Sequence, residues 1–236
     1  MIHVDVTVSH PAIVGGMLRG KTAVVIDTLR ATSVMVTAMS NGADEIRCVL
    51  EPEEALALKE KDQKLILGGE RSSLKIPGFD LSNSPLEFTR EIVSGKCLVM
   101  TTSNGTRALL KSEEAEKVYI GCLLNASSAS EKALAEGRDI QLINAGTAGL
   151  FTLDDFIAAG AMIHQLKGRV TLSDTARAAL LLFEAYPDIH SALRGSRHYE
   201  RLHSIGRQED LDYCLSTDLV SIVPVYQAGR VTLDRQ

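Results

Sequence analysis

Short runs of apolar, β-branched residues alternate with longer helical patterns along most of this sequence. The alternation extends to about residue 165, and the runs are apolar throughout rather than at every second position. Strands joined by helical crossovers pair in parallel, and strands without a polar face are covered by helices on both sides. The predicted strands are residues 24–26, 45–50, 64–67, 96–100, 118–120 and 140–145. The sequence therefore predicts an α/β fold, a three-layer α/β/α sandwich with a mostly parallel sheet.

The last third of the chain is predicted to be mostly helical. The helical patterns cover residues 153–166, 173–185 and 196–216. A late strand is predicted over 219–223, ending at Pro224, and no linker, repeat or low-complexity tract interrupts the chain. We therefore expect residues 1–236 to form a single domain, in which the C-terminal helices act as a solvated cover rather than as a pocket wall.

Charge and aromatic content narrow the classes of function. The chain has 25 Lys and Arg against 30 Asp and Glu, a net charge of −5, and only 4% aromatic residues with no Trp. Nucleic-acid binders rely on basic surfaces and stacking aromatics, so we expect no nucleic-acid partner. No apolar run reaches the roughly 18 residues of a membrane span, and the N-terminus lacks a signal-peptide pattern. We therefore expect no membrane association and a cytoplasmic location.

Polar residues follow several of the predicted strands, at the edge where open parallel sheets bind ligands. The segment after strand 96–100 reads Thr-Thr-Ser-Asn-Gly-Thr-Arg over Thr101–Arg107. Such a turn presents backbone N–H groups at the positive end of a helix, and an arginine there can hold a phosphate or carboxylate by two hydrogen bonds. The alternative is an ordinary helix N-cap with a surface arginine. A second helix start of this kind contains Thr32, beside Arg30.

Carboxylates also follow the predicted strands. Asp27 and Glu70 come directly after apolar strands, and Asp154 and Asp155 begin the helix after a glycine-rich turn. A buried carboxylate must be paired or must bind a cation, so the alternatives here are salt bridges and charge matching at a helix start. A site with only oxygen ligands suits Mg²⁺. Anion pockets beside such a cation predict phosphate chemistry.

Two other signatures of phosphate chemistry are absent. The chain has no GxxxxGK[ST] motif, which excludes a P-loop nucleotide hydrolase. Asp27 is followed by Thr28 and Leu29, so the second Asp of the haloacid-dehalogenase pattern, its usual acid and base, is missing. A GxSxG nucleophile elbow is absent as well.

One set of segments, taken together, carries a family resemblance. The segments are Val24–Thr32, Gly69–Arg71, Ile76–Leu81, Asn83–Pro85, Thr101–Arg107, Asn125–Ala126, Ala145–Thr147 and Ala159–Gly160. In this order they resemble 2-phosphosulfolactate phosphatase, from about residue 22 to Pro224. The resemblance implies a phosphoric monoester hydrolase that uses Mg²⁺ to convert (2R)-2-phospho-3-sulfolactate to 3-sulfolactate and phosphate. It also implies the three-layer fold, a homo-oligomer such as a dimer, and, in methanogens, a place in coenzyme M synthesis.

The chain departs from the family pattern at a few positions. Ser72-Ser73 and Ala148 stand where the family has Asn-Gly and Asn, and both lie in expected pocket loops. Smaller departures are Ser82, Ser103 and Asp154. The carboxylates and arginines are kept, so we expect a phosphatase. A phosphatase of another small phosphorylated 2-hydroxy acid is the alternative, and a non-catalytic anion-binding protein is a further one.

The candidate site residues take three roles around a small anionic phosphorylated substrate. The candidate catalytic residues are Asp27, Arg30, Glu70, Arg71 and Arg107. The candidate ligands of Mg²⁺ are Asp27, Glu70, Asp154 and Asp155. The candidate substrate-binding residues are Thr32, Thr101, Thr102, Ser103, Asn104, Gly105, Thr106, Gly146 and Thr147. The nucleophile is expected to be either water activated by the metal or Asp27 through an aspartyl-phosphate.

Overall fold

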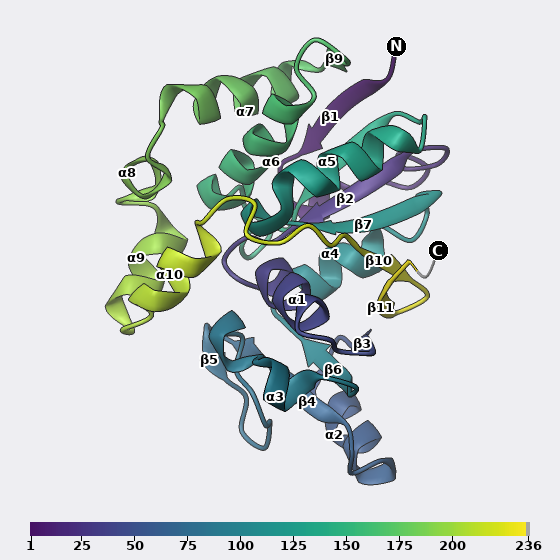
Figure 1. Cartoon of the computed structure of the whole chain (residues 1–236), viewed down its shortest axis with the longest axis vertical. Coiled ribbons are helices and arrows are strands. Elements are labelled where there is room, and N and C mark those ends of the chain that lie inside the picture. The colour runs from purple at the N-terminus through teal and green to yellow at the C-terminus, as the bar shows by residue number, and fades with distance from the viewer. Residues whose placement is uncertain (235–236) are drawn as a thin grey trace.

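A computed structural model describes residues 1–234, in which eleven strands form one sheet with helices on both faces (Figure 1). The strands are β1 His3–Thr7, β2 Thr22–Ile26, β3 Glu45–Cys48, β4 Ile66–Arg71, β5 Leu74–Lys75, β6 Cys97–Thr101, β7 Lys117–Gly121, β8 Ile140–Asn144, β9 Thr171–Leu172, β10 Pro224–Gln227 and β11 Arg230–Leu233. Their order across the sheet is β5-β4-β6-β3-β11-β10-β7-β2-β8-β1-β9. The predicted α/β class with a mostly parallel sheet is confirmed.

The helices alternate with these strands and then dominate the C-terminal part. The α-helices are α1 Ala31–Ser40, α2 Pro52–Lys61, α3 Arg90–Val93, α4 Gly105–Lys111, α5 Ala126–Ala135, α6 Leu153–Gln165, α7 Asp174–Ala185, α8 Ile189–Leu193, α9 Arg197–Ser204 and α10 Gln208–Cys214. Short 3₁₀ turns are His10–Ala12, Pro85–Glu87 and Leu123–Asn125. Within residues 1–234, none of these helices combines the length and apolar character needed to cross a bilayer.

The centre of the sheet departs from the predicted parallel order. The hairpin β10–β11 is antiparallel to its neighbours and joins two parallel sets, β7-β2-β8-β1-β9 on one side and β3-β6-β4 on the other (Figure 1). The strand predicted over 219–223 is wrong, because strand structure begins only at Pro224. The hairpin turn, Ala228–Gly229, has φ values of 47° and 79°, the type I′ geometry. Its first residue is not the usual Asn or Asp, so the sequence pattern hid the turn.

Helix α1 fixes the place where the two parallel sets meet. Its residues 31–39 are all buried, as expected for a helix without a polar face. Val34 and Met35 share a core with Ile46 of β3, Ile120 of β7 and Tyr226 of β10. The opposite face of the sheet is covered by α5, α6 and α7. Because α1 begins four residues after Asp27, this packing anchors the end of β2 in the interior.

The C-terminal helices differ from expectation in two ways. The single helix predicted over 196–216 is two helices, α9 and α10, separated by a break at which Gly206 has a φ of 71°. The expectation that this region only covers the surface is wrong for α9, because His198 and Leu202 line a pocket at the strand ends. The strand predicted over 64–67 is also longer than expected, since β4 continues to Arg71 and pairs with β5.

Helices α6 and α7 approach each other closely at Gly160. A Cβ at this position would lie 2.2 Å from the carbonyl oxygen of Ala179 and 2.8 Å from the Cβ of Phe183. We predict that Gly160→Ala lowers the free energy of unfolding by about 1–3 kcal/mol, because overpacking outweighs the gain in helix propensity. Urea unfolding measures the change. Gly15→Ala is the control, since no atom lies within 4 Å of its Cβ, and equal midpoints for wild type and Gly160→Ala would contradict the packing described.

Candidate active site

A small pocket lies where strand ends from both parallel sets meet the start of α1. Its volume is about 100 Å³. Residues that follow β2, β4, β6 and β8 supply most of its lining, and α9 closes it. The lining residues are Asp27, Leu29, Arg30, Glu70, Ser72, Ser73, Asn83, Ser103, Asn104, Thr147, His198 and Leu202. Six of the candidates from sequence are thus brought together: Asp27, Arg30, Glu70, Ser103, Asn104 and Thr147.

Asp27 is held at the start of α1 by its own neighbours. Its Oδ1 accepts a hydrogen bond from the backbone N–H of Ala31 at 3.1 Å, and its backbone N–H donates to Oγ1 of Thr32 at 2.9 Å. Its Oδ2 has no hydrogen-bond partner within residues 1–234 and lies against Gly105, where a Cβ would be only 2.8 Å away. Gly105 therefore lets the start of α4 approach Asp27. One carboxylate oxygen remains available for a ligand.

Glu70 ties together the ends of β4 and β6. Its Oε1 accepts a hydrogen bond from the backbone N–H of Ser103 at 2.7 Å, and its Oε2 accepts one from the backbone N–H of Ser73 at 2.8 Å. Each oxygen still has a lone pair available. Glu70 is therefore a fixed carboxylate that lines the pocket and can also bind a ligand there.

The two adjacent aspartates at the start of α6 have different partners. Asp155 accepts hydrogen bonds from the backbone N–H groups of Thr28 at 2.9 Å and Gly146 at 3.0 Å, and from the hydroxyl of Thr152 at 3.0 Å. It therefore serves as a structural clamp between the ends of β2 and β8. Oδ2 of Asp154 instead lies 3.1 Å from Nδ1 of His198. The buried Oδ1 of Asp154 has no hydrogen-bond partner within residues 1–234. Neither aspartate lines the pocket.

Among the three candidate arginines, only Arg30 reaches the pocket. Its side chain is 2% exposed, pairs with Asp210 of α10 at 2.5 Å and donates to the carbonyl of Ser73 at 3.1 Å. The structure does not bring Arg71 and Arg107 into the pocket lining. Both pair with the Glu51 carboxylate outside the pocket. The distance is 3.6 Å from Nη2 of Arg71 to Oε2 and 2.8 Å from Nη2 of Arg107 to Oε1.

Most of the hydroxyl groups predicted to hold substrate are used within the protein. Thr102 accepts from the backbone N–H of Thr106, and the hydroxyl of Thr106 donates back to the carbonyl of Thr102. Thr101 donates to the carbonyl of Leu50 and accepts from Arg71. These bonds cap and anchor α4. They leave Ser103 and Asn104 as the residues of this turn that line the pocket.

The pocket combines buried acids with a positively charged imidazole. Burial raises the pKa of Asp27 to about 6, against the attraction of His198. Burial also raises the pKa of Asp155 well above its usual value, and the charges of Asp154 and Asp27 add to the shift. Burial alone would lower the pKa of His198, but the negative charges of Asp154, Asp27 and Asp155 outweigh it and raise that pKa to about 9.

Sequence patterns missed the contribution of the C-terminal helices. His198 and Leu202 lie four residues apart on one face of α9, and Asp210 holds Arg30 from α10. The signal for α9 was its amphipathic spacing, with Tyr199 and Leu202 buried. That spacing shows that one face packs inward, but it does not show against what. No local pattern distinguishes a pocket wall from a cover.

The oxygen atoms of Asp27 and Glu70 are the candidates for holding a metal ion. Within residues 1–234, no group of three or more His, Cys, Asp or Glu side chains is arranged around a common point. Mg²⁺ usually keeps several waters and takes only one or two protein carboxylates. The open Oδ2 of Asp27 and the nearby carboxylate of Glu70 therefore fit a hydrated Mg²⁺. They do not fit an ion that needs a complete cage of protein ligands.

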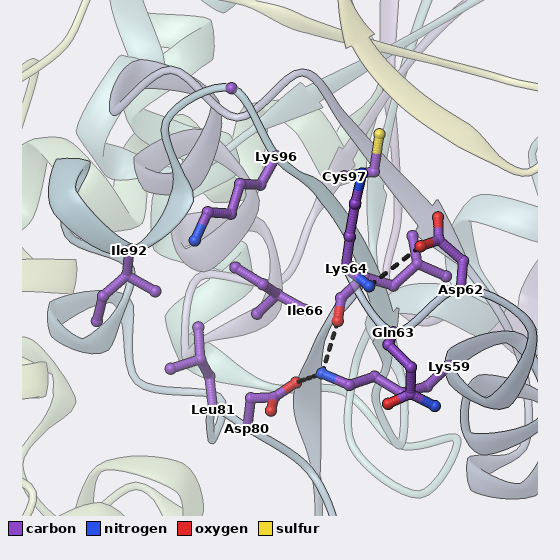
Figure 2. Close-up of a pocket in the computed structure, with 12 residues that line it drawn as sticks. Lys59, Asp62, Gln63, Lys64, Ile66, Asp80, Leu81, Ile92, Lys96 and Cys97 are labelled. Carbon is purple, nitrogen blue, oxygen red and sulfur yellow. Dashed lines mark hydrogen bonds and ion pairs between the residues drawn. The ribbon is translucent and has the colours of Figure 1, made fainter.

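A larger hollow, of about 720 Å³, lies at the opposite ends of β4 and β6 (Figure 2). Lys59, Lys64 and Lys96 line it, above the apolar side chains of Ile66, Leu81 and Ile92. Lys59 points to Asp80, and their side chains pair at 2.7 Å (Figure 2). No candidate residue from the sequence lines this hollow, so the smaller pocket is the better candidate for chemistry.

Burial of the Asp27 charge predicts a pH-dependent effect on stability. Its pKa is about 6 in the folded protein and 3.8 when unperturbed, so the stability it contributes is present below pH 3.8 and is lost as pH rises through about 6. In metal-free protein at pH 8, Asp27→Asn should raise the free energy of unfolding by on the order of 3 kcal/mol. Denaturant unfolding at several pH values tests this. The gain should vanish near pH 3.5, and a gain that is absent or independent of pH would contradict it.

Comparison with known proteins places this chain in one family. A family model described as 2-phosphosulpholactate phosphatase matches residues 11–229. Proteins named "Probable 2-phosphosulfolactate phosphatase" are 45% identical over 232 residues in Clostridium novyi (strain NT), and 43% identical over 236 residues in Clostridium beijerinckii. These alignments cover 97% and 98% of this chain and 99% of each relative. The chain therefore belongs to the 2-phosphosulpholactate phosphatase family.

Proposed function

We propose that this protein is a Mg²⁺-dependent phosphatase that hydrolyses (2R)-2-phospho-3-sulfolactate to 3-sulfolactate and phosphate. The observation that carries the proposal is the convergence of Asp27, Glu70, Arg30 and His198 on one small pocket. Family membership and the names of the relatives support the same reaction. A pocket of about 100 Å³ suits a small ligand.

The charges in the pocket require a cation if a phosphate ester is to bind. A phosphate monoester carries about −1.5 to −2 charges at neutral pH, and Asp27 and Glu70 would repel it. We propose that Asp27, through Oδ2, and Glu70 hold the ion. When bound, Mg²⁺ supplies charge neutralisation and polarisation of the phosphoryl group. Asp154 and Asp155 are not included, because neither lines the pocket, and Asp155 is already satisfied by two backbone N–H groups and the Thr152 hydroxyl.

The protein's own cationic groups would orient the anionic substrate. Arg30 is fixed by Asp210 and by the carbonyl of Ser73, so its guanidinium is held in place before substrate arrives. Ser84 donates to the second oxygen of Asp210 at 2.5 Å and completes this support. Positioning and charge stabilisation supply most of the catalysis in phosphoryl transfer. We therefore assign Arg30 to holding a phosphate, carboxylate or sulfonate group.

Two nucleophiles are compatible with the position of Asp27. Its open Oδ2 would orient a water molecule toward phosphorus, or would itself attack and form an aspartyl-phosphate. The haloacid-dehalogenase pattern places a second Asp two residues later for the second route, and Leu29 stands there. We therefore propose attack by water. The predicted cytoplasmic location, homodimer and link to coenzyme M synthesis stay predictions.

A second candidate function is a phosphatase of another small phosphorylated 2-hydroxy acid. The observation that favours it is the composition of the pocket loops, in which Ser72, Ser73 and Ala148 replace the Asn and Gly of the family pattern. All three have left-handed φ values, of 54°, 69° and 51°. Asn and Gly adopt this conformation readily, whereas Ser and Ala do so at a cost. The turns are therefore kept, while two side chains at the pocket are changed.

The metal proposal predicts complete dependence on a divalent ion. Excess chelator should abolish phosphate release from 2-phosphosulfolactate, and added Mg²⁺ should restore it. Asp27→Asn should weaken Mg²⁺ binding at least tenfold, measured by calorimetry, because a charged ligand becomes neutral. Asp62→Asn, an exposed change in the other hollow, is the matched control. Full activity in excess chelator would contradict the proposal that the reaction needs a divalent ion.

A panel of substrates separates the candidate functions. We expect kcat/KM for 2-phosphosulfolactate to exceed that for 2-phospholactate by roughly 10-fold to 100-fold, since a charged hydrogen bond to the sulfonate contributes about 1.5–3 kcal/mol. Phosphate release measures both rates. A preference for the ester without sulfonate would favour the second candidate. Binding of these esters without any hydrolysis would indicate a non-catalytic anion-binding protein.

A further inference from the structure

Asn83 brings an unused amide group to the pocket. It lies between β5 and the 3₁₀ turn Pro85–Glu87, it lines the pocket, and it is 4% exposed. Its Oδ1 is buried and accepts no hydrogen bond within residues 1–234, and its Nδ2 donates none to those residues. We propose that Asn83 is a specificity residue, whose Nδ2 donates a hydrogen bond to an acid group of the substrate that is not transferred. The proposal rests on the phosphatase function proposed above.

A structural role does not account for the amide of Asn83. Buried amides are normally hydrogen-bonded within the protein, because burial without a partner is destabilising. Asn125, which is fully buried, shows the usual arrangement. Its Oδ1 accepts from the backbone N–H of Cys122 at 3.0 Å, and its Nδ2 donates to the carbonyls of Ile120 at 3.2 Å and Ile222 at 3.0 Å. Asn83 makes no such bonds in the part of the chain that the structure describes, so its amide is available for a ligand.

The chain on both sides of Asn83 is fixed by hydrogen bonds. The backbone N–H and the hydroxyl of Ser82 donate to the carboxylate of Glu87 at 2.6 Å and 2.7 Å. The backbone N–H of Ser84 donates to the Ser82 hydroxyl at 3.2 Å, and the hydroxyl of Ser84 donates to Asp210 at 2.5 Å. The backbone that carries the amide is therefore held in place before substrate arrives, which lowers the entropic cost of binding.

The carboxylate of Asp210 links the Asn83 segment to Arg30. One of its oxygens accepts from the hydroxyl of Ser84, the residue after Asn83, and the other accepts from the guanidinium of Arg30 at 2.5 Å. Asn83 and Arg30 both line the pocket. The same buried carboxylate therefore supports a neutral N–H donor and a positive charge that face one small pocket.

The charges in the pocket decide which group of the substrate meets Asn83. The phosphoryl group needs the ion held by Asp27 and Glu70, since those two carboxylates would otherwise repel it. The carboxylate and the sulfonate of 2-phosphosulfolactate are ionised at neutral pH, so they accept hydrogen bonds and donate none. They need cationic groups or N–H donors, and Arg30 and Nδ2 of Asn83 supply one of each. The structure of the pocket therefore assigns Asn83 to the carboxylate or the sulfonate.

Four phosphate esters test this contact. 2-Phosphosulfolactate carries both acid groups, 2-phospholactate only the carboxylate, the phosphate ester of 2-hydroxyethanesulfonate only the sulfonate, and ethyl phosphate neither. Asn83→Leu keeps the size of the side chain and removes the donor. It should lower kcat/KM on 2-phosphosulfolactate by about 10-fold to 100-fold, the range for a hydrogen bond to a charged group. The loss should persist on the ester that carries the contacted group, which identifies that group, and should be absent on ethyl phosphate.

Stability separates this role from a structural one. Asn83→Leu should leave the urea midpoint of unfolding unchanged or raise it, because it removes a buried polar atom that has no partner within residues 1–234. Asn125→Leu is the matched control and should lower the midpoint, because it breaks three hydrogen bonds of a buried amide. Equal losses of kcat/KM on all four esters would overturn the proposal, and so would wild-type kcat/KM on 2-phosphosulfolactate.

Binding of the product gives a readout that needs no turnover. 3-Sulfolactate keeps both acid groups and lacks the phosphoryl group, so Asn83→Leu should weaken its binding by a similar factor in calorimetry. Unchanged binding would contradict the contact. Failure of the contact is distinct from failure of the function. If the wild type hydrolyses none of the four esters, the phosphatase function itself is wrong, whereas active wild type with an unaffected Asn83→Leu variant contradicts the contact alone.

Discussion

The burial of carboxylates at one junction of strand ends is the constraint on which this structure depends. Asp27, Glu70 and the two aspartates that begin α6 are each less than 9% exposed. A cluster of this kind folds only if backbone N–H groups, cations or protons offset the charge. Here Asp155 and Glu70 are satisfied by backbone N–H groups, whereas Asp27 keeps one oxygen without a partner in the part of the chain that the structure describes. The fold thus places a buried charge where a ligand can meet it.

The supports of the pocket come from parts of the chain that have no direct link in sequence. Hairpin β10–β11 joins the two parallel sets, and α1 packs against both of them. Helix α10 then holds Arg30 through Asp210, while α9 places His198 over Asp154. The C-terminal third therefore completes the site instead of merely covering it. Rigid placement of this kind is what phosphoryl transfer needs, because catalysis rests on positioning.

The sequence predicted what local patterns encode, and missed what depends on distant packing. Alternating apolar runs predicted the parallel strands, and polar residues after them located Asp27, Glu70 and Thr147. The central hairpin was missed, because its turn begins with Ala228 rather than Asn and its strands lie at the end of a helical region. His198 was missed because the sequence around a histidine on an amphipathic helix does not show which distant residues that histidine contacts. Arg71 and Arg107 were placed in the site from proximity along the chain, but their side chains face Glu51, and a catalytic role for them stays a prediction.

The central claim is that a divalent ion and a phosphoryl group meet at the open oxygen of Asp27. The most direct measurement is a crystal structure with Mn²⁺ in place of Mg²⁺ and with bound phosphate, in which anomalous scattering locates the metal. We expect the metal at a bonding distance of about 2 Å from Oδ2 of Asp27. The phosphate should lie between the metal ion and the side chains of Arg30 and Thr147. Metal and phosphate found instead in the hollow lined by Lys59, with Asp27 free of both, would contradict it.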